Sequence, residues 1–165
     1  MKLNLENFDI RRSQPTIVDN YRLPENFERY ILKGEGLIGI DIFKGDKVKI
    51  TNSEGGQICE VVLFDLLGNN NQSIIDNIVN GDAKYIKYVL TNGNDKKTLL
   101  KKLRNKKIDF NNCKSTNFFN YNTIENEHVE FIIHDEGFIL FAAPGEAMNV
   151  DKQNAPTDLE ILIEL

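Results

Sequence analysis

The chain is poor in cysteine and proline and has no long apolar run. Its two cysteines, Cys59 and Cys113, are too few for a disulfide framework. No stretch of about 18 consecutive apolar residues occurs, which excludes a membrane-spanning helix. The first residues also lack the apolar core of a secretory signal. We therefore expect a cytoplasmic protein without a membrane partner.

Basic side chains are scarce outside one segment. The formal net charge is −5, yet residues 84–107 hold nine basic residues and one acid, which leaves 11 basic and 24 acidic residues elsewhere. The segment is either a solvated face of helices or a docking patch for an acidic partner or polyanionic ligand. It carries no aromatic platform for stacking bases, so we expect no nucleic-acid partner.

What is present is the composition of one globular domain. The chain has 165 residues, of which 41% are hydrophobic and 27% charged, which is enough to bury a core without disulfides or a structural metal. We expect a single domain over residues 1–165. It would have an N-terminal arm at 1–26, a β core at 28–68 and 116–165, and a helical insert at 70–110.

Alternation of apolar and polar residues between glycine-bounded turns predicts antiparallel strands on both sides of that insert. The run at 57–64 is nearly continuously apolar, as in a central strand buried on both faces, and residues 52–56 are expected to form a hairpin loop. The fold class is therefore mainly β, a sandwich or barrel-like domain with a helical decoration. The expected strands lie at 28–33, 38–43, 46–51, 57–64, 117–121, 128–134, 138–142 and 159–165.

Apolar residues at helical spacing predict two helices in the insert, at 71–80 and 95–107. Asp95 is a candidate N-cap for the second of these. The pattern at 84–90 fits either a helix or a strand.

Motifs for metal or nucleotide binding are missing. His128 and His134 lie six residues apart on one expected strand, about 20 Å in extended chain, so they cannot share a metal ion. His128 and Glu130 share a face, but two ligands do not make a site. The G-x-G-x-x-G spacing from Gly34 to Gly39 precedes a strand rather than a helix. We expect no metal in this chain.

A nucleophile is not evident either. Cys59 lies in a strand that the pattern predicts to be buried, where cysteines are usually inert. Its pairing with a histidine could arise only in three dimensions.

The polar loop after the 138–142 strand is the most distinctive segment, and it is either a ligand-binding loop or a plain connection. A pocket is expected where the 57–65 strand meets the 143–158 loop. Gln57 and Asn154 would offer amide groups there, with Glu60 or Asp158 as the anion for a cationic amine. The full set of ligand-binding candidates is Gln57, Cys59, Glu60, His134, Glu146, Asn154 and Asp158.

Four segments carry a family resemblance: 44–50, 54–65, 143–148 and 153–158. With them the chain resembles the urea carboxylase-associated family. It is more closely similar to the domain of this type at the N-terminus of aminomethyltransferase-like demethylases, which are themselves similar to the glycine-cleavage T-protein. The resemblance implies a β-rich domain. Metal-binding members hold zinc through cysteines and a histidine. Here Ala143-Pro144 stands where those members have Cys-Pro.

Three functional hypotheses remain, of which the first two are implied by the resemblance. The first is an accessory or binding domain, working beside a folate-dependent aminomethyltransferase-like demethylase in the one-carbon metabolism of small methylated amines. The folate would belong to that partner and no cofactor to this chain, and we expect a homo-oligomer. The second is a stand-alone hydrolase of a small amidine or carboxyamine compound. The third is a small-ligand sensor or scaffold. The hydrolase would draw on Glu54, Gln57, Cys59, Glu60, His134 and Asp158.

Overall fold

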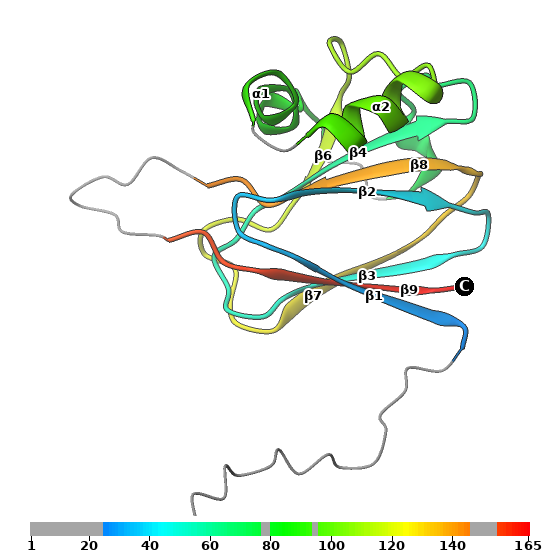
Figure 1. Ribbon diagram of the computed structural model, residues 1–165. Helices are drawn as coiled ribbons and strands as arrows, with labels where there is room; N and C mark the ends of the chain where they lie inside the picture. Colours follow the sequence, from blue (N-terminus) through cyan, green and yellow to red (C-terminus); the bar gives the residue numbers. More distant parts are fainter. Residues whose placement is uncertain (1–24, 77–79, 94–95, 146–154) are drawn as a thin grey trace, which may run out of the picture.

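The computed structural model describes residues 25–76, 80–93, 96–145 and 155–165 (Figure 1). Glu146, Asn154, the candidate cap Asp95 and most of the expected arm lie outside these ranges. The strands are β1 (Phe27–Leu32), β2 (Leu37–Ile42), β3 (Lys47–Asn52), β4 (Cys59–Asp65), β5 (Asn80–Gly81), β6 (Ser115–Phe118), β7 (Glu127–Ile132), β8 (Gly137–Ala142) and β9 (Leu159–Glu164). The helices are the 3-10 helix η2 (Gln72–Ile74), α1 (Lys84–Asn92) and α2 (Lys97–Asn105).

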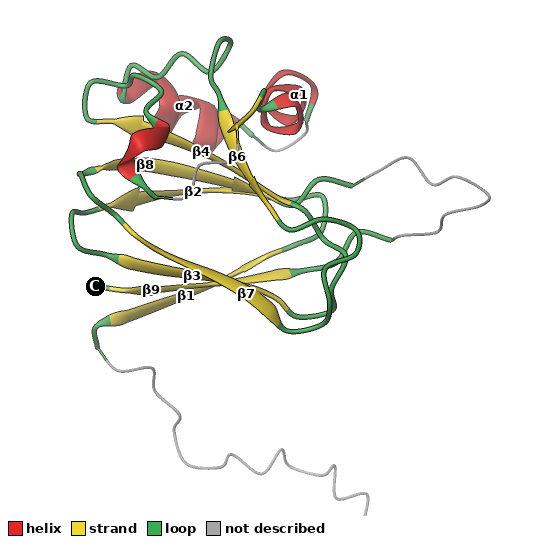
Figure 2. Ribbon diagram, turned by 180° about the vertical axis from the view of Figure 1, so that it is seen from behind, coloured by secondary structure: helices red, strands yellow, loops and turns green. Residues whose placement is uncertain are grey.

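The strands form two antiparallel sheets stacked face to face, which confirms the mainly β class and selects the sandwich over a barrel. The first sheet has the order β1-β9-β3-β7 and the second has the order β2-β8-β4-β6-β5. Figure 2 shows both helices on the outer face of the second sheet. That sheet is therefore covered on both sides, by the first sheet and by the helices.

This layering explains the burial of the central strands. All six residues of β8 and the first six of β4 are buried, as the apolar run predicted for β4. In β9, by contrast, only alternate residues are buried, among them Ile161 and Ile163. A strand with one covered face alternates, whereas a strand covered on both faces does not.

The prediction that residues 52–56 form a hairpin loop is wrong. This segment joins β3 of the first sheet to β4 of the second sheet, so these two strands do not pair with each other. Gly55 and Gly56 both adopt positive φ, which allows the reversal between layers. Glycine-rich turns and period-2 alternation are the same in both cases, so the sequence could not separate a hairpin from a change of sheet.

The helix expected at 71–80 is also wrong over its described part. Only η2 forms, and Asn80 already belongs to strand β5. Gln72 explains the early end, because its side chain bonds the backbone of β4 at Val61 and Leu63 and the hydroxyl of Thr116 on β6. These side-chain bonds hold the segment against the sheet instead of letting it continue as a helix.

The structure contains helices in the other two segments where the sequence allowed them. The second expected helix is confirmed as α2, and the ambiguous segment at 84–90 is helical as α1. The strand expected at 117–121 ends at Phe118, because Phe119 adopts a φ of 66°. In the described ranges no helix combines the length and apolar character needed to cross a membrane.

Gly137 gives a test of the central packing. A Cβ at this position would overlap the backbone carbonyl oxygen of Phe64 on the neighbouring β4. We expect Gly137→Ala to lower the free energy of unfolding by roughly 1–3 kcal/mol, the usual cost of overpacking. Urea denaturation measures this, with the exposed neighbour substitution Glu136→Ala as control. Equal unfolding midpoints for the two variants would contradict the packing described.

Candidate functional site

An open groove of about 500 Å³ lies beside the start of β4. Of the two segments expected to form a pocket, the groove includes Ile58 and Glu60 from the first and Pro144 from the second. We call it the Glu60 groove. Its lining residues come from four separate stretches of chain: Ile58, Glu60, Gly81, Asp82, Lys84, Tyr85, Asn117, Tyr121 and Pro144.

Sheet register brings these stretches together. Glu60 pairs with Ala142 of β8 on one side and with Asn117 of β6 on the other. Pro144 follows two residues after Ala142, and β5 pairs with β6 at Gly81 and Ser115. The groove is therefore a product of strand pairing between segments far apart in the sequence.

Glu60 is the buried acid of the groove, with only 5% of its surface exposed. Its Oε2 accepts a hydrogen bond of 2.8 Å from the backbone N–H of Ile86, in the first turn of α1. The N-cap residue Ala83 has a φ of 51° and offers no side-chain cap. The carboxylate of Glu60 therefore takes the place of an N-cap and faces the positive end of the helix dipole.

The environment of Glu60 acts on its pKa in two directions. Burial raises the pKa by disfavouring the charged form. Hydrogen bonds from the backbone N–H groups of Ile86 and Tyr85 and from the hydroxyl of Ser115 lower it, as does the charge of Lys87. Burial is the larger effect, so the pKa of Glu60 is raised overall.

Tyr85 forms an aromatic wall that the backbone holds in place. Its hydroxyl donates a hydrogen bond of 2.8 Å to the carbonyl oxygen of Glu35. Burial and the nearby charge of Glu35 raise the pKa of Tyr85, while the backbone N–H of Gly145 lowers it. Because its hydroxyl is engaged, Tyr85 presents a ring in a fixed position. Tyr121 is 44% exposed on the same groove.

The exposed charges of the groove differ in their partners. Asp82 forms an ion pair of 3.0 Å with Lys114, and this contact lowers the pKa of Asp82. Lys84 is exposed, and its charge also contributes to the lowered pKa of Asp82. The groove thus contains one buried acid, Glu60, and an exposed acid, Asp82, with lysines beside it.

Gln57 lies next to the groove, but its side-chain amide forms hydrogen bonds with backbone groups of the chain itself. Its Nε2 donates to the carbonyl oxygens of Pro144 and Ile58, at 2.8 and 2.9 Å. Its Oε1 accepts a hydrogen bond of 2.9 Å from the N–H of Thr157. Gln57 thereby ties together the two described ends of the segment that the sequence analysis proposed as a binding loop.

Two further candidates for ligand binding, Cys59 and Asp158, do not line the groove. Cys59 is fully buried in the core between the sheets, and burial raises the pKa of its thiol far above the ordinary range. Asp158 accepts hydrogen bonds from the N–H of Gly34 at 3.0 Å and from Lys33 at 2.6 Å. The bond from Lys33 is the main cause of the lowered pKa of Asp158.

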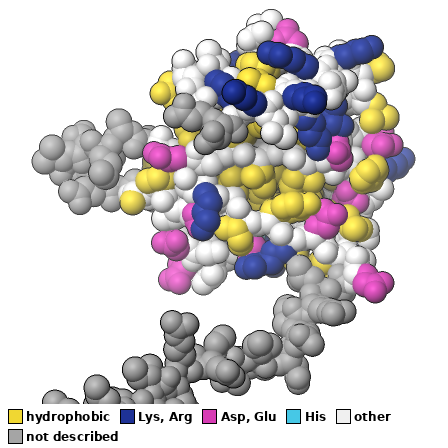
Figure 3. Space-filling model, in the orientation of Figure 1, with side chains coloured by type: hydrophobic (Ala, Val, Ile, Leu, Met, Phe, Trp, Pro, Cys, Tyr) yellow, Lys and Arg dark blue, Asp and Glu magenta, His cyan; other side chains and the backbone are white. Residues whose placement is uncertain are grey.

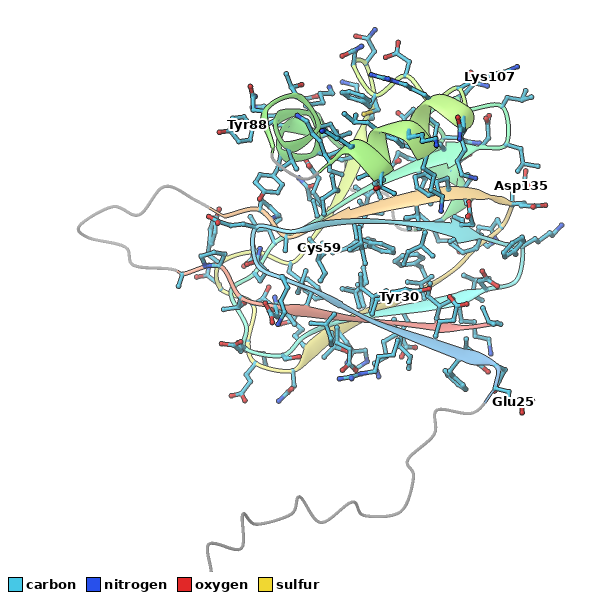
Figure 4. All side chains as sticks on the ribbon, viewed as in Figure 1. Glu25, Tyr30, Cys59, Tyr88, Lys107 and Asp135 are labelled. Carbon is cyan, nitrogen blue, oxygen red and sulfur yellow. The ribbon has the colours of Figure 1, made fainter. Side chains whose placement is uncertain are left out.

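His134 lies at the opposite end of the sandwich from the groove. Its Nε2 is 2.9 Å from Asp76. It follows β7 and precedes Gly137, which pairs with Asp65, whereas Ala142 pairs with Glu60. Those two pairs lie five residue steps apart along β8, or about 17 Å. In Figure 4 Cys59 points between the layers, while Asp135, the neighbour of His134, lies at the far edge.

Cys59 and His134 therefore do not form a catalytic pair. Glu54 is exposed in the 52–56 loop. In the described ranges no group of three or more His, Cys, Asp or Glu side chains is placed to hold a metal ion.

Sequence reasoning named Glu60 as a candidate but did not name the other polar residues of the lining: Asp82, Lys84, Tyr85, Asn117 and Tyr121. No local signal marks them, because they reach Glu60 only through the β4–β6 and β5–β6 pairings.

A second hollow of about 390 Å³ lies on the outside of the first sheet. Its charges neutralise one another within the sheet, with Lys47 3.4 Å from Glu164 and Lys49 3.6 Å from Glu130. It offers no buried polar group, so the Glu60 groove is the better candidate.

The pH dependence of stability tests the environment of Glu60. A pKa raised above its ordinary value of 4.5 means that the folded chain holds this proton more tightly than the unfolded chain. The resulting stabilisation is fully present below the unfolded pKa and is lost as pH rises through the folded pKa. Glu60→Gln has no such proton. We expect the free energy of unfolding of the parent, minus that of Glu60→Gln, to fall as the pH is raised above the ordinary value of 4.5 and through the raised pKa of Glu60.

Urea denaturation across this pH range measures the difference. Glu54→Gln serves as the matched control, since Glu54 is exposed. A difference for Glu60→Gln that stays constant with pH would show that burial does not dominate at Glu60.

Comparison with known proteins gives one distant relative to report. No family model matches the chain. The chain is 29% identical over 144 residues to trimethylamine-oxide aldolase of Ruegeria pomeroyi. The match covers 87% of this chain but 18% of that protein, so the chain spans less than a fifth of its relative's length. The comparisons thus point to this aldolase and lend no support to the urea carboxylase-associated family in particular.

Proposed function

We propose that this chain is a binding domain for a small methylated amine compound, and that it works beside an aminomethyltransferase-like demethylase. One observation carries the proposal: the structure assembles an open groove with a buried acid and two tyrosines, while Cys59 is fully buried and lies far from His134. The distant likeness to trimethylamine-oxide aldolase supports the choice of compound class.

Binding fits the geometry better than covalent catalysis. A nucleophile must be accessible and must contact a base that activates it. Cys59 is buried without exposure, and His134 lies at the other end of the sheet. By contrast, aromatic faces and a carboxylate are the groups that recognise alkylated ammonium ions.

The partner is proposed from the family resemblance. Folate-dependent transfer of one-carbon units would belong to the aminomethyltransferase-like protein, and this chain would hold the amine. We further propose that the domain forms a homo-oligomer in this assembly.

Purification of the endogenous assembly tests the partner. We expect native mass spectrometry of the tagged chain to show a complex that includes an aminomethyltransferase-like protein, identified by peptide sequencing. The tag alone, expressed in the same cells, controls for non-specific capture. A preparation containing only 18.9 kDa subunits would contradict the association.

A hydrolase of small amidines or carboxyamines is the second candidate. The raised pKa of Glu60 on an open groove favours it, because acid–base catalysts are tuned in this way. Under the binding proposal we expect the chain to release no ammonia from such compounds above the uncatalysed rate. Ammonia release is measured for the parent, for Glu60→Gln, and for Cys59→Ala combined with His134→Ala.

The variants separate the two candidates. Turnover that survives the Cys59 and His134 double substitution but disappears in Glu60→Gln would overturn the binding proposal and make Glu60 a catalytic acid or base. Turnover lost in the double variant would overturn it in favour of a cysteine or histidine mechanism.

A further inference from the structure

Exposed apolar side chains gather at the end of the sandwich that lies opposite the Glu60 groove. Leu66 and Leu67 follow β4 and are 68% and 78% exposed, and Phe43 follows β2 and is 52% exposed. The strands β4 and β2 finish at the same end of the second sheet, because the last residue of each pairs with Gly137 of β8. We call the surface formed by Phe43, Leu66 and Leu67 the leucine end.

The turn that carries the two leucines is held by hydrogen bonds. Residues 65–68 form a tight turn, in which the N–H of Gly68 donates a hydrogen bond of 3.0 Å to the carbonyl oxygen of Asp65. The carboxylate of Asp65 also accepts the N–H groups of Leu67 and Asn69, both at 2.9 Å. Polar residues, glycine and proline are the usual choices for the centre of such a turn, so two exposed leucines there are unusual. Because the turn is already fixed, little conformational entropy is lost when a partner covers the leucines.

Phe43 belongs to a second fixed turn. Its N–H donates a hydrogen bond of 2.9 Å to the carboxylate of Asp46, and its carbonyl oxygen accepts the N–H of Asp46 at 3.1 Å. The N–H of Gly45 donates to the carbonyl oxygen of Ile133 at 2.8 Å, and the N–H of Ile133 donates to the carbonyl oxygen of Asp46 at 2.9 Å. Three exposed apolar side chains on two fixed turns are typical of a surface that a protein partner covers.

Charges of opposite sign border the leucines on two sides. On one side Gly68 lies against the chain that follows α2, since a Cβ there would be 2.6 Å from the carbonyl oxygen of Lys107. On another side β4 adjoins β8, and the turn that precedes β8 contains the exposed acids Asp135 and Glu136. Figure 4 shows Lys107 and Asp135 at the same end of the molecule. An apolar centre with one basic and one acidic side is complementary to a second copy of itself turned by 180°.

We propose that the leucine end docks against the leucine end of a second copy of this chain, in a contact with two-fold symmetry. Leu66 and Leu67 of each copy pack on those of the other with Phe43 beside them, and Lys107 of each copy faces the acidic turn of the other. Both Glu60 grooves stay open in this dimer, because they lie at the far ends of the two sandwiches. The inference rests on the homo-oligomer of the proposed function and names the surface through which it forms.

Sedimentation velocity of the purified full chain over a range of concentrations measures the association. We expect a dimer whose Kd rises about tenfold or more when Leu66→Asn and Leu67→Asn are combined. Ile124→Asn is the matched control, because Ile124 is 70% exposed in the loop that precedes β7, and it should leave the Kd unchanged. Thermal unfolding of each variant confirms that it is folded.

Charge reversal tests the two-fold arrangement. Lys107→Glu and Glu136→Lys should each weaken self-association, because like charges then face each other across the contact. An equimolar mixture of these two variants should associate about threefold or more tightly than either variant alone, since each copy again meets the opposite charge. A mixture that associates no better than the separate variants would overturn the two-fold arrangement.

The other outcomes separate the surface from the proposed function. A dimer that is indifferent to the leucine substitutions would overturn the leucine end as the interface and leave the homo-oligomer standing. A chain that stays monomeric at every concentration would overturn the second copy and the homo-oligomer together. In that case a complex with a co-purified protein that depends on both leucines would assign the surface to that protein. The association with an aminomethyltransferase-like protein is decided separately, by purification of the endogenous assembly.

Discussion

Burial of β4 and β8 on both faces is the constraint on which the rest of the structure depends. One face packs against the first sheet and the other against α1 and α2. Such strands must be almost wholly apolar, because a polar side chain on either face loses its water. β8 obeys this without exception, and β4 has one charged residue among its first six, Glu60. The position of that exception determines where the candidate site lies.

Glu60 and α1 satisfy each other's hydrogen-bonding groups. A helix leaves its first N–H groups without intrahelical partners, and Ala83 cannot cap them. A buried carboxylate needs donors, and α1 supplies them through Ile86 and Tyr85. Because Glu60 lies near the start of β4, this contact forms at the end of the sheet, where the cover provided by the helices stops. The same contact therefore fixes the start of α1 and leaves an open edge beside a carboxylate.

Local pattern was enough to predict most strands and α2, since alternation and helical spacing reflect which faces are covered. Local pattern gave wrong predictions where contacts between distant segments determine the structure. Ile74 and Ile75 fit a helical stripe, yet the side chain of Gln72 binds the segment to β4 and β6. Gln57 has the amide expected of a ligand-binding residue, but it binds Pro144 and Thr157 instead. The donors and acceptors of a side chain can be read from sequence, whereas the groups that occupy them depend on register.

The basic segment consists of two groups of side chains with different roles. Lys102 and Lys106 bind Asp41 and lie over the ring of Phe138, 4.9 and 5.2 Å from its centre, so they fasten α2 to the sheet. Other basic side chains remain on the surface over the helices, where Figure 3 shows them gathered. Residues 84–107 hold nine basic residues and one acid, whereas the whole chain has a net charge of −5. An anion that approaches the helical layer is therefore attracted and a cation is repelled, and salt weakens both effects. The basic segment thus serves packing at Lys102 and Lys106 and surface charge at its other positions.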